Sequence, residues 1–406
     1  MKNLQTLYRF ELKKILSRKI VWITVAVMMI FTIFTTCGQL MGGLYIDGKK
    51  VDTTYNLMLK TRAEERALTG RLIDQQLLEE TWDAYGKIPD TGSTHYTGTD
   101  EYWEYAFHYS AIFTFVQSYT GMTTTEAFDW KAEEVDEAEL YSRRQDMLEQ
   151  MWNRLYLSEG EKEYWGRQEL SIERPLRFAY KEGWWTLFNA LYTTGITVLL
   201  TVAICLSNIF TVEQVRKTDQ LIFCSRYGKD SLYLAKILAG ISFSVGVAFL
   251  YTVASFIEAL AVYGGDGFSA AFQLVFPAYS AQISVGWAVL AGYGLMFIAA
   301  ILTGAFVMVL SEALKNGTGT LAVANGIILL TVFVDMPYRY RALAQIWEYI
   351  PSELLSIWSI FDSRLVPLAG TYLTNIQFVP VLYTAATGII FVIGFKIYQR
   401  YQVEAR

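Results

Sequence analysis

The sequence predicts an all-α polytopic membrane protein with six transmembrane helices and a mostly α-helical extracellular domain between the first two of them. Three observations support this fold class. Hydrophobic residues make up 53% of the 406 positions and are concentrated in six long runs. Lysine and arginine cluster beside some ends of these runs and are absent from others. One long polar segment, residues 45–184, interrupts the runs after the first.

The six apolar runs have the length and composition of membrane spans. Crossing a hydrocarbon core of ~30 Å takes about 20 residues, and a run of roughly 18 or more with few charges is typical of a span. The first run is too long for the apolar part of a signal peptide, so we expect it to be retained. The predicted spans are residues 20–44, 185–210, 235–263, 283–310, 318–335 and 378–395, so that 235–336 holds spans three to five and 378–406 the sixth span with a cytoplasmic tail.

The distribution of basic residues predicts that both termini are cytoplasmic. Lysine and arginine precede the first span and follow the second, fourth and sixth, whereas residues 264–282 contain neither. This is the pattern of the positive-inside rule. The three cysteines, Cys37, Cys205 and Cys224, all lie outside the predicted extracellular domain, which must therefore fold without disulfides. We expect a multi-pass protein of a bacterial plasma membrane.

The extracellular domain, residues 45–184, is acidic and long enough to bury its own core. It holds 27 Asp and Glu against 16 Lys and Arg, a net charge of −11. Apolar residues recur at helical spacing, and Ser158 with Glu161 has the spacing of a capping box. The turn at Asp47–Asp52 marks a possible entry to the domain.

Aromatic residues are dense in this domain, notably in the stretch Tyr102–Tyr109 and at Trp130, Trp152 and Trp165. Three interpretations stay open: a hydrophobic core, a belt at the membrane interface, or a surface on which a ligand stacks. An acidic, aromatic surface suits a cationic amphiphilic peptide.

Catalytic motifs are missing from the sequence. No GxxxxGK[ST] segment is present to hold nucleotide phosphates, and there is no HExxH or CxxC. The two histidines, His95 and His108, have no partner cluster for a metal. Charges near the span ends, Glu258, Glu312 and Asp335, are expected to anchor at the interface rather than to form an ion path. We therefore expect neither an enzyme nor a metal site.

Two elements flank the spans. Residues 1–19 have apolar positions at 3–4 spacing with basic residues on the other side, which predicts an amphipathic helix lying at the cytoplasmic membrane surface. Residues 337–377 alternate short apolar stretches with Pro351 and Pro367. Each stretch is too short to cross a membrane, which predicts interfacial or re-entrant helices on the outer side.

The polar segment 211–234 between the second and third spans is long and patterned. Residues from Glu213 can continue a helix, the run Arg226-Tyr-Gly228 breaks it, and Asp230 or Ser231 can cap the next one. Glu213 is expected on the exposed face. The pattern predicts helix, turn and helix at the membrane surface. An ordinary basic loop that only sets the topology is the alternative.

This segment, the topology and the N-terminal stretch resemble the membrane subunits of ABC-2 type transporters (type V ABC exporter-like permeases). The resemblance covers residues 1–44 and 185–406. Lys217 stands where that family usually has Gly, Arg226 where Pro is common, and Ala235 where Gly often precedes the lysine. The resemblance implies an ATPase-coupling site at Glu213, Arg216, Lys217, Thr218, Leu221, Ile222, Ser225, Arg226, Lys229 and Lys236, and an elbow helix with Glu11, Lys13, Lys14 and Arg18.

The resemblance further implies a half-transporter for export of an amphiphilic or peptide substrate. Two copies, or one copy and a sister permease, would enclose a path through the lipid, and separate ABC ATPase subunits would bind ATP and Mg. No cofactor is then expected on this chain, and no nucleic acid among its partners. Gly38 and Gly42 have the small-xxx-small spacing of close helix contacts and are a candidate dimer contact. The alternative function is a membrane-anchored receptor or scaffold whose extracellular domain binds a ligand or partner.

Overall fold

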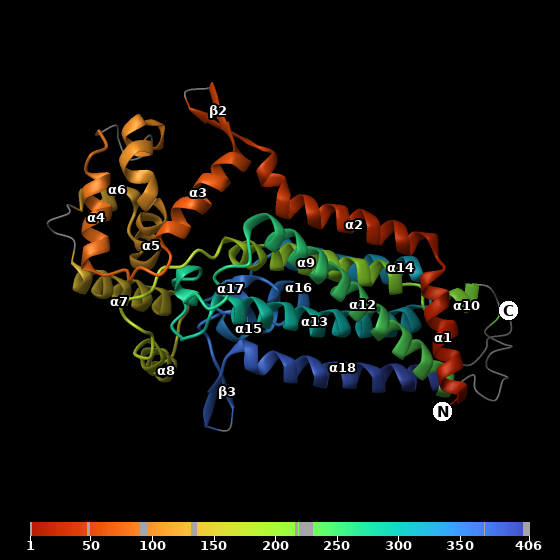
Figure 1. Cartoon of the computed structure of the whole chain (residues 1–406). Helices are drawn as coiled ribbons and strands as arrows, with labels where there is room; N and C mark the ends of the chain where they lie inside the picture. Colours follow the sequence, from red (N-terminus) through yellow and green to blue (C-terminus); the bar gives the residue numbers. More distant parts are fainter. Residues whose placement is uncertain are drawn as a thin grey trace.

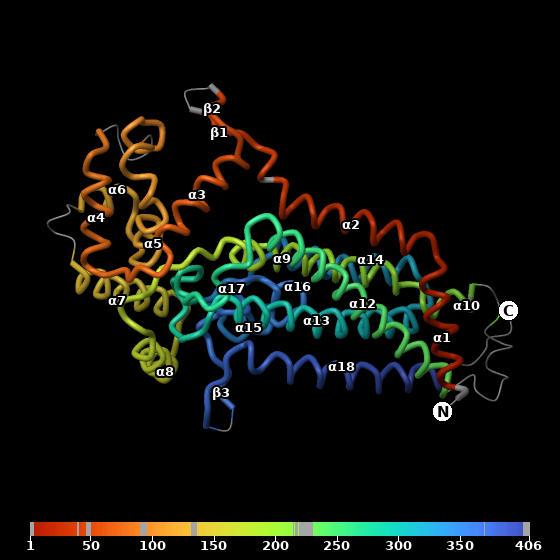
Figure 2. The backbone as a smooth tube through the Cα atoms, in the orientation of Figure 1, coloured from red at the N-terminus to blue at the C-terminus, as the bar shows by residue number. Residues whose placement is uncertain are grey.

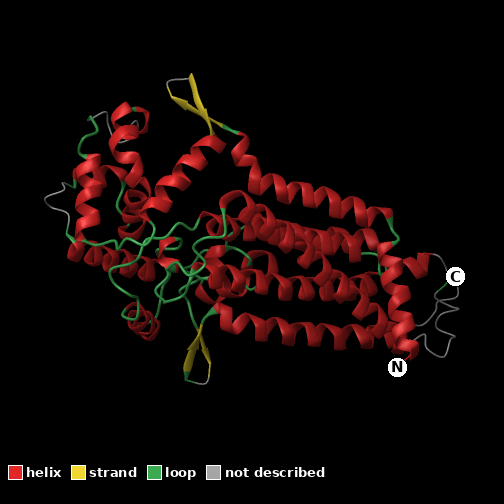
Figure 3. Ribbon diagram, in the orientation of Figure 1, coloured by secondary structure: helices red, strands yellow, loops and turns green. Residues whose placement is uncertain are grey.

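The structure is a computed structural model of the chain and describes residues 2–46, 49–89, 96–130, 136–215, 218, 230–368 and 370–400. Long helices run side by side in a bundle, and a smaller helical part lies at one end of it (Figure 1). Helices account for nearly all the regular structure (Figure 3). The predicted all-α character is therefore confirmed.

Five described helices are long and apolar enough to cross a membrane. A further apolar helix, α14 (Gly317–Phe333), has 17 residues. At 1.5 Å per residue it reaches roughly 26 Å, slightly less than the hydrocarbon core. The five long helices are α2 (Lys19–Cys37), α9 (Glu182–Leu206), α12 (Asp230–Tyr263), α13 (Val285–Leu314) and α18 (Asn375–Arg400).

Helices α9 and α13 form the centre of the bundle, and α2 and α18 lie at its edges (Figure 1). The apolar windows of α9 and α13 are 72% and 67% buried, against 28% for α2 and 17% for α18. The edge helices expose large apolar side chains, for example Phe34 on α2 and Val381 on α18. Such surfaces suit contact with lipid, whereas water would oppose them.

Hydroxyl groups bind three of the long helices to one another inside the bundle. The hydroxyl oxygens of Thr32 on α2 and Thr197 on α9 are 3.2 Å apart. The hydroxyl oxygen of Thr201 on α9 lies 3.3 Å from that of Tyr251 on α12. Tyr251 in turn donates to the carbonyl of Val25 at 3.0 Å. Hydrogen bonds of this kind join helices where lipid offers no alternative partner.

The smaller helical part is formed by residues 45–184, named here the insertion domain. Many of its aromatic residues form a hydrophobic core, which is one of the three interpretations that the sequence allowed. Tyr85 stacks on Phe113 with ring centres 3.8 Å apart, and Trp82 meets Trp130 edge to face at 5.3 Å. Its helices are α3 (Thr54–Leu68), α4 (Gln75–Tyr85), α5 (Ser110–Thr120), α6 (Thr124–Asp129), α7 (Glu137–Arg154) and α8 (Glu159–Glu169), with single turns at Tyr96–Gly98, Tyr102–Ala106 and Phe107–Tyr109.

The capping box at the start of α8 is confirmed, and it has a second role. One carboxylate oxygen of Glu161 accepts from Ser158 N at 2.8 Å, as expected. The other oxygen accepts from Leu365 N at 2.8 Å and from Arg341 at 2.5 Å. Glu161 therefore also ties the insertion domain to the segment between α14 and α18.

The entry to the insertion domain differs from the expectation. The first long helix ends at Cys37 rather than at residue 44, a short helix of another type covers Gly38–Met41, and a hairpin of β1 (Gly43–Ile46) and β2 (Lys49–Thr53) follows (Figure 2). Gly38 and Gly42 therefore do not share one face of an α-helix. The spacing argument for a dimer contact there is lost, because it requires a continuous helix.

The segment between α14 and α18 contains three short helices, as its proline spacing indicates. It also contains a hairpin that the sequence analysis did not anticipate. Two charged side chains are buried here in contact with each other: Arg364 Nε lies 2.6 Å from Asp362 Oδ2. The elements are α15 (Arg341–Glu348), α16 (Pro351–Leu354), α17 (Ile357–Ile360), β3 (Val366–Leu368) and β4 (Thr371–Leu373).

Candidate functional site

Helix α12 carries a buried lysine in its second turn, at the end of the bundle away from the insertion domain. Lys236 is 1% exposed. Its ammonium donates to Glu11 Oε2 at 3.0 Å, to Glu213 Oε1 at 2.9 Å and to the carbonyl of Ile209 at 3.2 Å. An ammonium has three N–H donors, so all of them are used. Lys236 thereby connects α12 to α1 (Lys2–Leu16) and to α10 (Thr211–Val215).

A second lysine completes a ring of alternating charge. Lys14 Nζ lies 2.5 Å from Glu11 Oε1 and 2.8 Å from Glu213 Oε1. Partial burial would lower the pKa of Lys14, but the hydrogen bonds to Glu11 and Glu213 outweigh it and raise that pKa above its ordinary value. We name Glu11, Lys14, Glu213 and Lys236 the charge cluster.

Helix α1 packs one side against the bundle, because the residues that make these contacts recur at intervals of three or four positions. Glu11 and Lys14 are three positions apart and so lie on one side of the helix. Glu11 and the neighbouring Ile15 are only 3% and 2% exposed, whereas Lys13 points to the exposed side. Tyr8 adds a hydrogen bond of 3.0 Å to Ser242 on α12. Helix α1 therefore crosses the end of the bundle in contact with α12 (Figure 2).

Aromatic rings lie beside the charge cluster. The ring centre of Phe210 is 5.5 Å from Lys236 Nζ, a distance at which a ring face attracts a cation. Phe210 also packs against Tyr233 and Tyr398, with ring centres 5.9 and 5.8 Å away. Because Tyr398 lies near the end of α18, the last long helix meets the same site.

The charge cluster joins α1, α10 and α12 through paired charges. Within these four residues, two carboxylates are matched by two ammonium groups. Breaking such a pair leaves an uncompensated charge, which costs about 3 to 5 kcal/mol for buried pairs. Across the described ranges, no group of three or more Asp, Glu, His or Cys side chains is arranged to hold a metal ion.

Four of the residues predicted for two separate sites meet in this cluster. Glu213 and Lys236 come from the predicted coupling site, and Glu11 and Lys14 from the elbow helix. Glu213 differs from its expected exposure because its side chain is 13% exposed and pairs within the chain. Thr218 also lies close, since its N–H donates to the Glu213 carbonyl at 3.0 Å.

The remaining predicted residues fall elsewhere. Arg18 donates to the carbonyl of Cys205 and so fixes the junction of α1 and α2 to the end of α9. Gly38 and Gly42 lie at the insertion end of the bundle. Outside the described residues are Arg216, Lys217, Leu221, Ile222, Ser225, Arg226 and Lys229.

Glu312 was missed as a member of this site. It lies on α13 at the same end of the bundle, is 2% exposed, and is close enough to Lys236 for electrostatic interaction. In the sequence, Glu312 is a carboxylate at the end of an apolar run. Anchoring at the membrane interface accounted for that position, so no ion-pair partner was sought for it.

Neither a scan against models of protein families nor a search of curated proteins found a match for this chain. The class of the protein therefore follows from its own fold. Five long apolar helices, with α2 and α18 exposing apolar side chains, have the character of a multi-pass membrane protein.

Proposed function

We propose that this chain is the membrane-spanning permease subunit of an ATP-driven ABC exporter for an amphiphilic or peptide substrate. In this function, segment 211–234 binds a separate ATPase subunit in the cytoplasm of a bacterial cell. The insertion domain then lies outside the cell, and α14 serves as the sixth span. A second copy or a sister permease completes the path.

The charge cluster is the observation that supports this proposal. Glu213 and Lys236 stand on either side of residues 216–229, and their side chains are in contact. The same two side chains also hold α1 through Glu11 and Lys14. A displacement of the polar segment therefore acts on α1 and α12 together. This arrangement suits a segment through which an ATPase moves the spans.

Co-purification tests the proposal. The tagged chain is isolated from its native host, and a P-loop ATPase is expected to accompany it. Leu221→Asp should remove the ATPase while the chain stays monodisperse in detergent. Leu170→Asp is the matched control, because Leu170 is 81% exposed in the insertion domain. Absence of an ATPase from the wild-type preparation, or its retention by Leu221→Asp, contradicts the proposal.

A membrane-anchored receptor or scaffold is the second candidate. A cavity of about 560 Å³ beside the insertion domain favours it, since a receptor requires a ligand site and a permease does not require one there. The gene beside this one distinguishes the two candidates. A P-loop ATPase gene favours transport, and a kinase gene alone favours sensing.

A further inference from the structure

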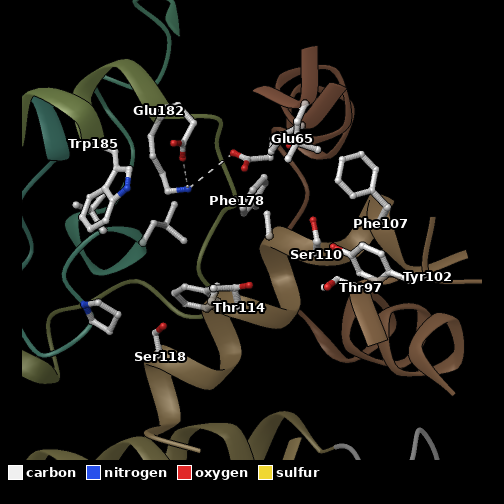
Figure 4. Close-up of a pocket in the computed structure, with 18 of the residues that line it drawn as sticks. Glu65, Thr97, Tyr102, Phe107, Ser110, Thr114, Ser118, Phe178, Glu182 and Trp185 are labelled. Carbon is white, nitrogen blue, oxygen red and sulfur yellow. Dashed lines mark ion pairs between the residues drawn. The ribbon is translucent and has the colours of Figure 1, made fainter. Parts of the chain in front are cut away.

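The cavity lies where the insertion domain meets the bundle. Its volume is about 560 Å³, which is in the range of pockets for small molecules. Helices α3 and α5 form one side, and the start of α9 with the segment 274–277 forms the other. Figure 4 shows side chains from both sides directed toward the same space.

The walls of the cavity have two different characters. Tyr102, Phe107 and Trp185 present aromatic rings (Figure 4). Polar groups come from α5, where Ser110, Thr114 and Ser118 carry hydroxyls at intervals of four residues. Residues four apart lie on one face of a helix, so the hydroxyls form a single stripe. A molecule with polar and apolar parts matches these walls.

A carboxylate in the cavity lacks a hydrogen-bond partner. Glu65 on α3 is 7% exposed, and its Oε2 has no hydrogen-bond partner among the residues that the structure describes. The ammonium of Lys181 is 4.0 Å from Glu65 Oε2 and 3.8 Å from Glu182 Oε1. Both distances exceed the 2.7–3.2 Å of a hydrogen bond. Buried carboxylates are normally satisfied, so this gap indicates a missing donor.

The charges around this carboxylate are also unequal. Glu65 and Glu182 face one ammonium, that of Lys181. The arginines on the same helix are engaged elsewhere: Arg62 donates to the Val262 carbonyl at 3.2 Å, and Arg66 pairs with Asp266. A cationic group in the cavity would supply the missing N–H donor at Glu65 and would bring a second ammonium to the two carboxylates.

We propose that this cavity binds a cationic amphiphile, in which an ammonium group contacts Glu65 and Glu182 and an apolar body lies against Tyr102, Phe107 and Trp185. The hydroxyl stripe of α5 accepts or donates hydrogen bonds around the cationic end. The ammonium comes either from a lipid-like alkylamine or from a lysine of an amphipathic peptide. This inference does not depend on the ATPase, so its outcome leaves the proposed function untouched.

Calorimetry on the full chain in nanodiscs of zwitterionic lipid tests the proposal. Dodecylammonium is titrated, and empty nanodiscs give the background from partitioning into lipid. We expect saturable binding that Glu65→Gln weakens tenfold or more. Thr114→Phe, which fills the space without changing charge, should weaken binding as well. Dodecanol has the same chain without the ammonium and should not compete.

The matched control is Glu64→Gln. Glu64 is the neighbouring carboxylate on α3, does not line the cavity, and pairs with His108 at 2.5 Å. Its removal should leave binding unchanged. A lysine-containing amphipathic peptide is titrated in parallel, and dependence of either ligand on Glu65 supports the site and identifies the source of the ammonium. Equal binding by wild type and Glu65→Gln for both ligands overturns the proposal, as does competition by dodecanol.

Discussion

Lys236 Nζ lies 2.9 Å from Glu213 Oε1, although the two residues are 23 positions apart in the chain. The contact joins α10 to α12, the described helices that precede and follow residues 216–229. Because Lys236 is 1% exposed, the pair is held inside the protein and is not open to a partner. In the proposed function, the ATPase is therefore bound by residues between the two, while Glu213 and Lys236 hold α10 to α12.

Replacing the buried lysine should destabilise the chain strongly. Lys236→Met leaves Glu11 and Glu213 with the half-exposed Lys14 in place of two cations, and Glu11 itself is 3% exposed. Removal of one partner from a buried ion pair costs about 3 to 5 kcal/mol. We expect a marked fall in the thermal unfolding temperature of the purified chain in detergent.

Lys14→Gln is the matched control for that change. Lys14 contacts the same two carboxylates, but its side chain is 52% exposed, and such pairs contribute about 0.2 to 1 kcal/mol. The double variant Lys236→Met with Glu213→Gln should regain part of the loss, because one carboxylate then faces one ammonium, that of Lys14. Equal effects of Lys236→Met and Lys14→Gln would contradict the cluster as described.

The sequence singles out the residues of the charge cluster, but it does not predict that they contact one another. Glu213 and Lys236 stand out in a polar segment between apolar runs, and Glu11 and Lys14 in a basic amphipathic stretch. Their contact joins positions up to 225 residues apart. Local periodicity describes which face of a helix is apolar, but it carries no information on which helix ends meet. Glu312 escaped notice for the same reason.

In the overall fold, too, the sequence predicts local structure but not the contacts between distant parts of the chain. Apolar runs predict the long helices to within a few residues, since length and hydropathy are local properties. The first span was predicted too long because Leu40, Met41 and Leu44 are apolar, yet they lie in a short helix and a strand. Only tertiary packing separates these conformations. The hairpin Val366–Leu373 is too short for strand periodicity to reveal.

Glu65 should make stability depend on pH in a defined direction. Burial raises the pKa of Glu65 to about 7, Glu182 adds to this effect and Lys181 opposes it. The folded state therefore binds this proton more tightly than the unfolded state, whose value is near 4.5. The resulting stabilisation is complete below about pH 4.5 and is lost as the pH rises through about 7.

Unfolding temperatures of wild type and Glu65→Gln, compared from pH 5 to pH 8, check this sign. The wild type should lose stability relative to Glu65→Gln over this interval. Affinity for dodecylammonium should change in the opposite sense, increasing as the pH rises through 7, because the carboxylate is then charged. A stability difference that does not vary with pH would show that Glu65 keeps an ordinary pKa.

Two glycines on α13 test the packing at the centre of the bundle. A Cβ on Gly304 would lie 2.4 Å from Ser244 Oγ on α12, whereas a Cβ on Gly294 meets nothing within 4 Å. Gly304→Leu should therefore force the helices apart at a cost of about 1 to 3 kcal/mol, the usual range for overpacking. Gly294→Leu should be tolerated. Thermal unfolding of both variants in detergent provides the measurement, and equal tolerance would place α12 and α13 farther apart.

Arg144 should be essential for the attachment of the insertion domain to the bundle. This residue on α7 is fully buried and donates to Glu169 at 2.7 and 3.0 Å. It also donates to the carbonyls of Pro277 and Tyr279, in the segment between α12 and α13, at 2.5 and 3.5 Å. Arg144→Met leaves Glu169 with a single, partly exposed partner, Arg174. We expect a loss of about 3 to 5 kcal/mol.

Replacing the neighbouring Arg143 is the control that distinguishes the attachment role of Arg144 from the general effect of removing a positive charge. Arg143 is 39% exposed, pairs with Glu139 on its own helix at 2.6 Å and lies 5.4 Å from the ring centre of Trp130, so Arg143→Met should cost about 1 kcal/mol or less. Limited proteolysis adds a readout specific to attachment. Arg144→Met should speed cleavage in the connection between α8 and α9, because the hydrogen bonds from α7 to the carbonyls of Pro277 and Tyr279 are lost and the two parts separate more often. Unchanged cleavage in Arg144→Met would mean that the apolar contacts between the insertion domain and the bundle hold the two parts together without this side chain.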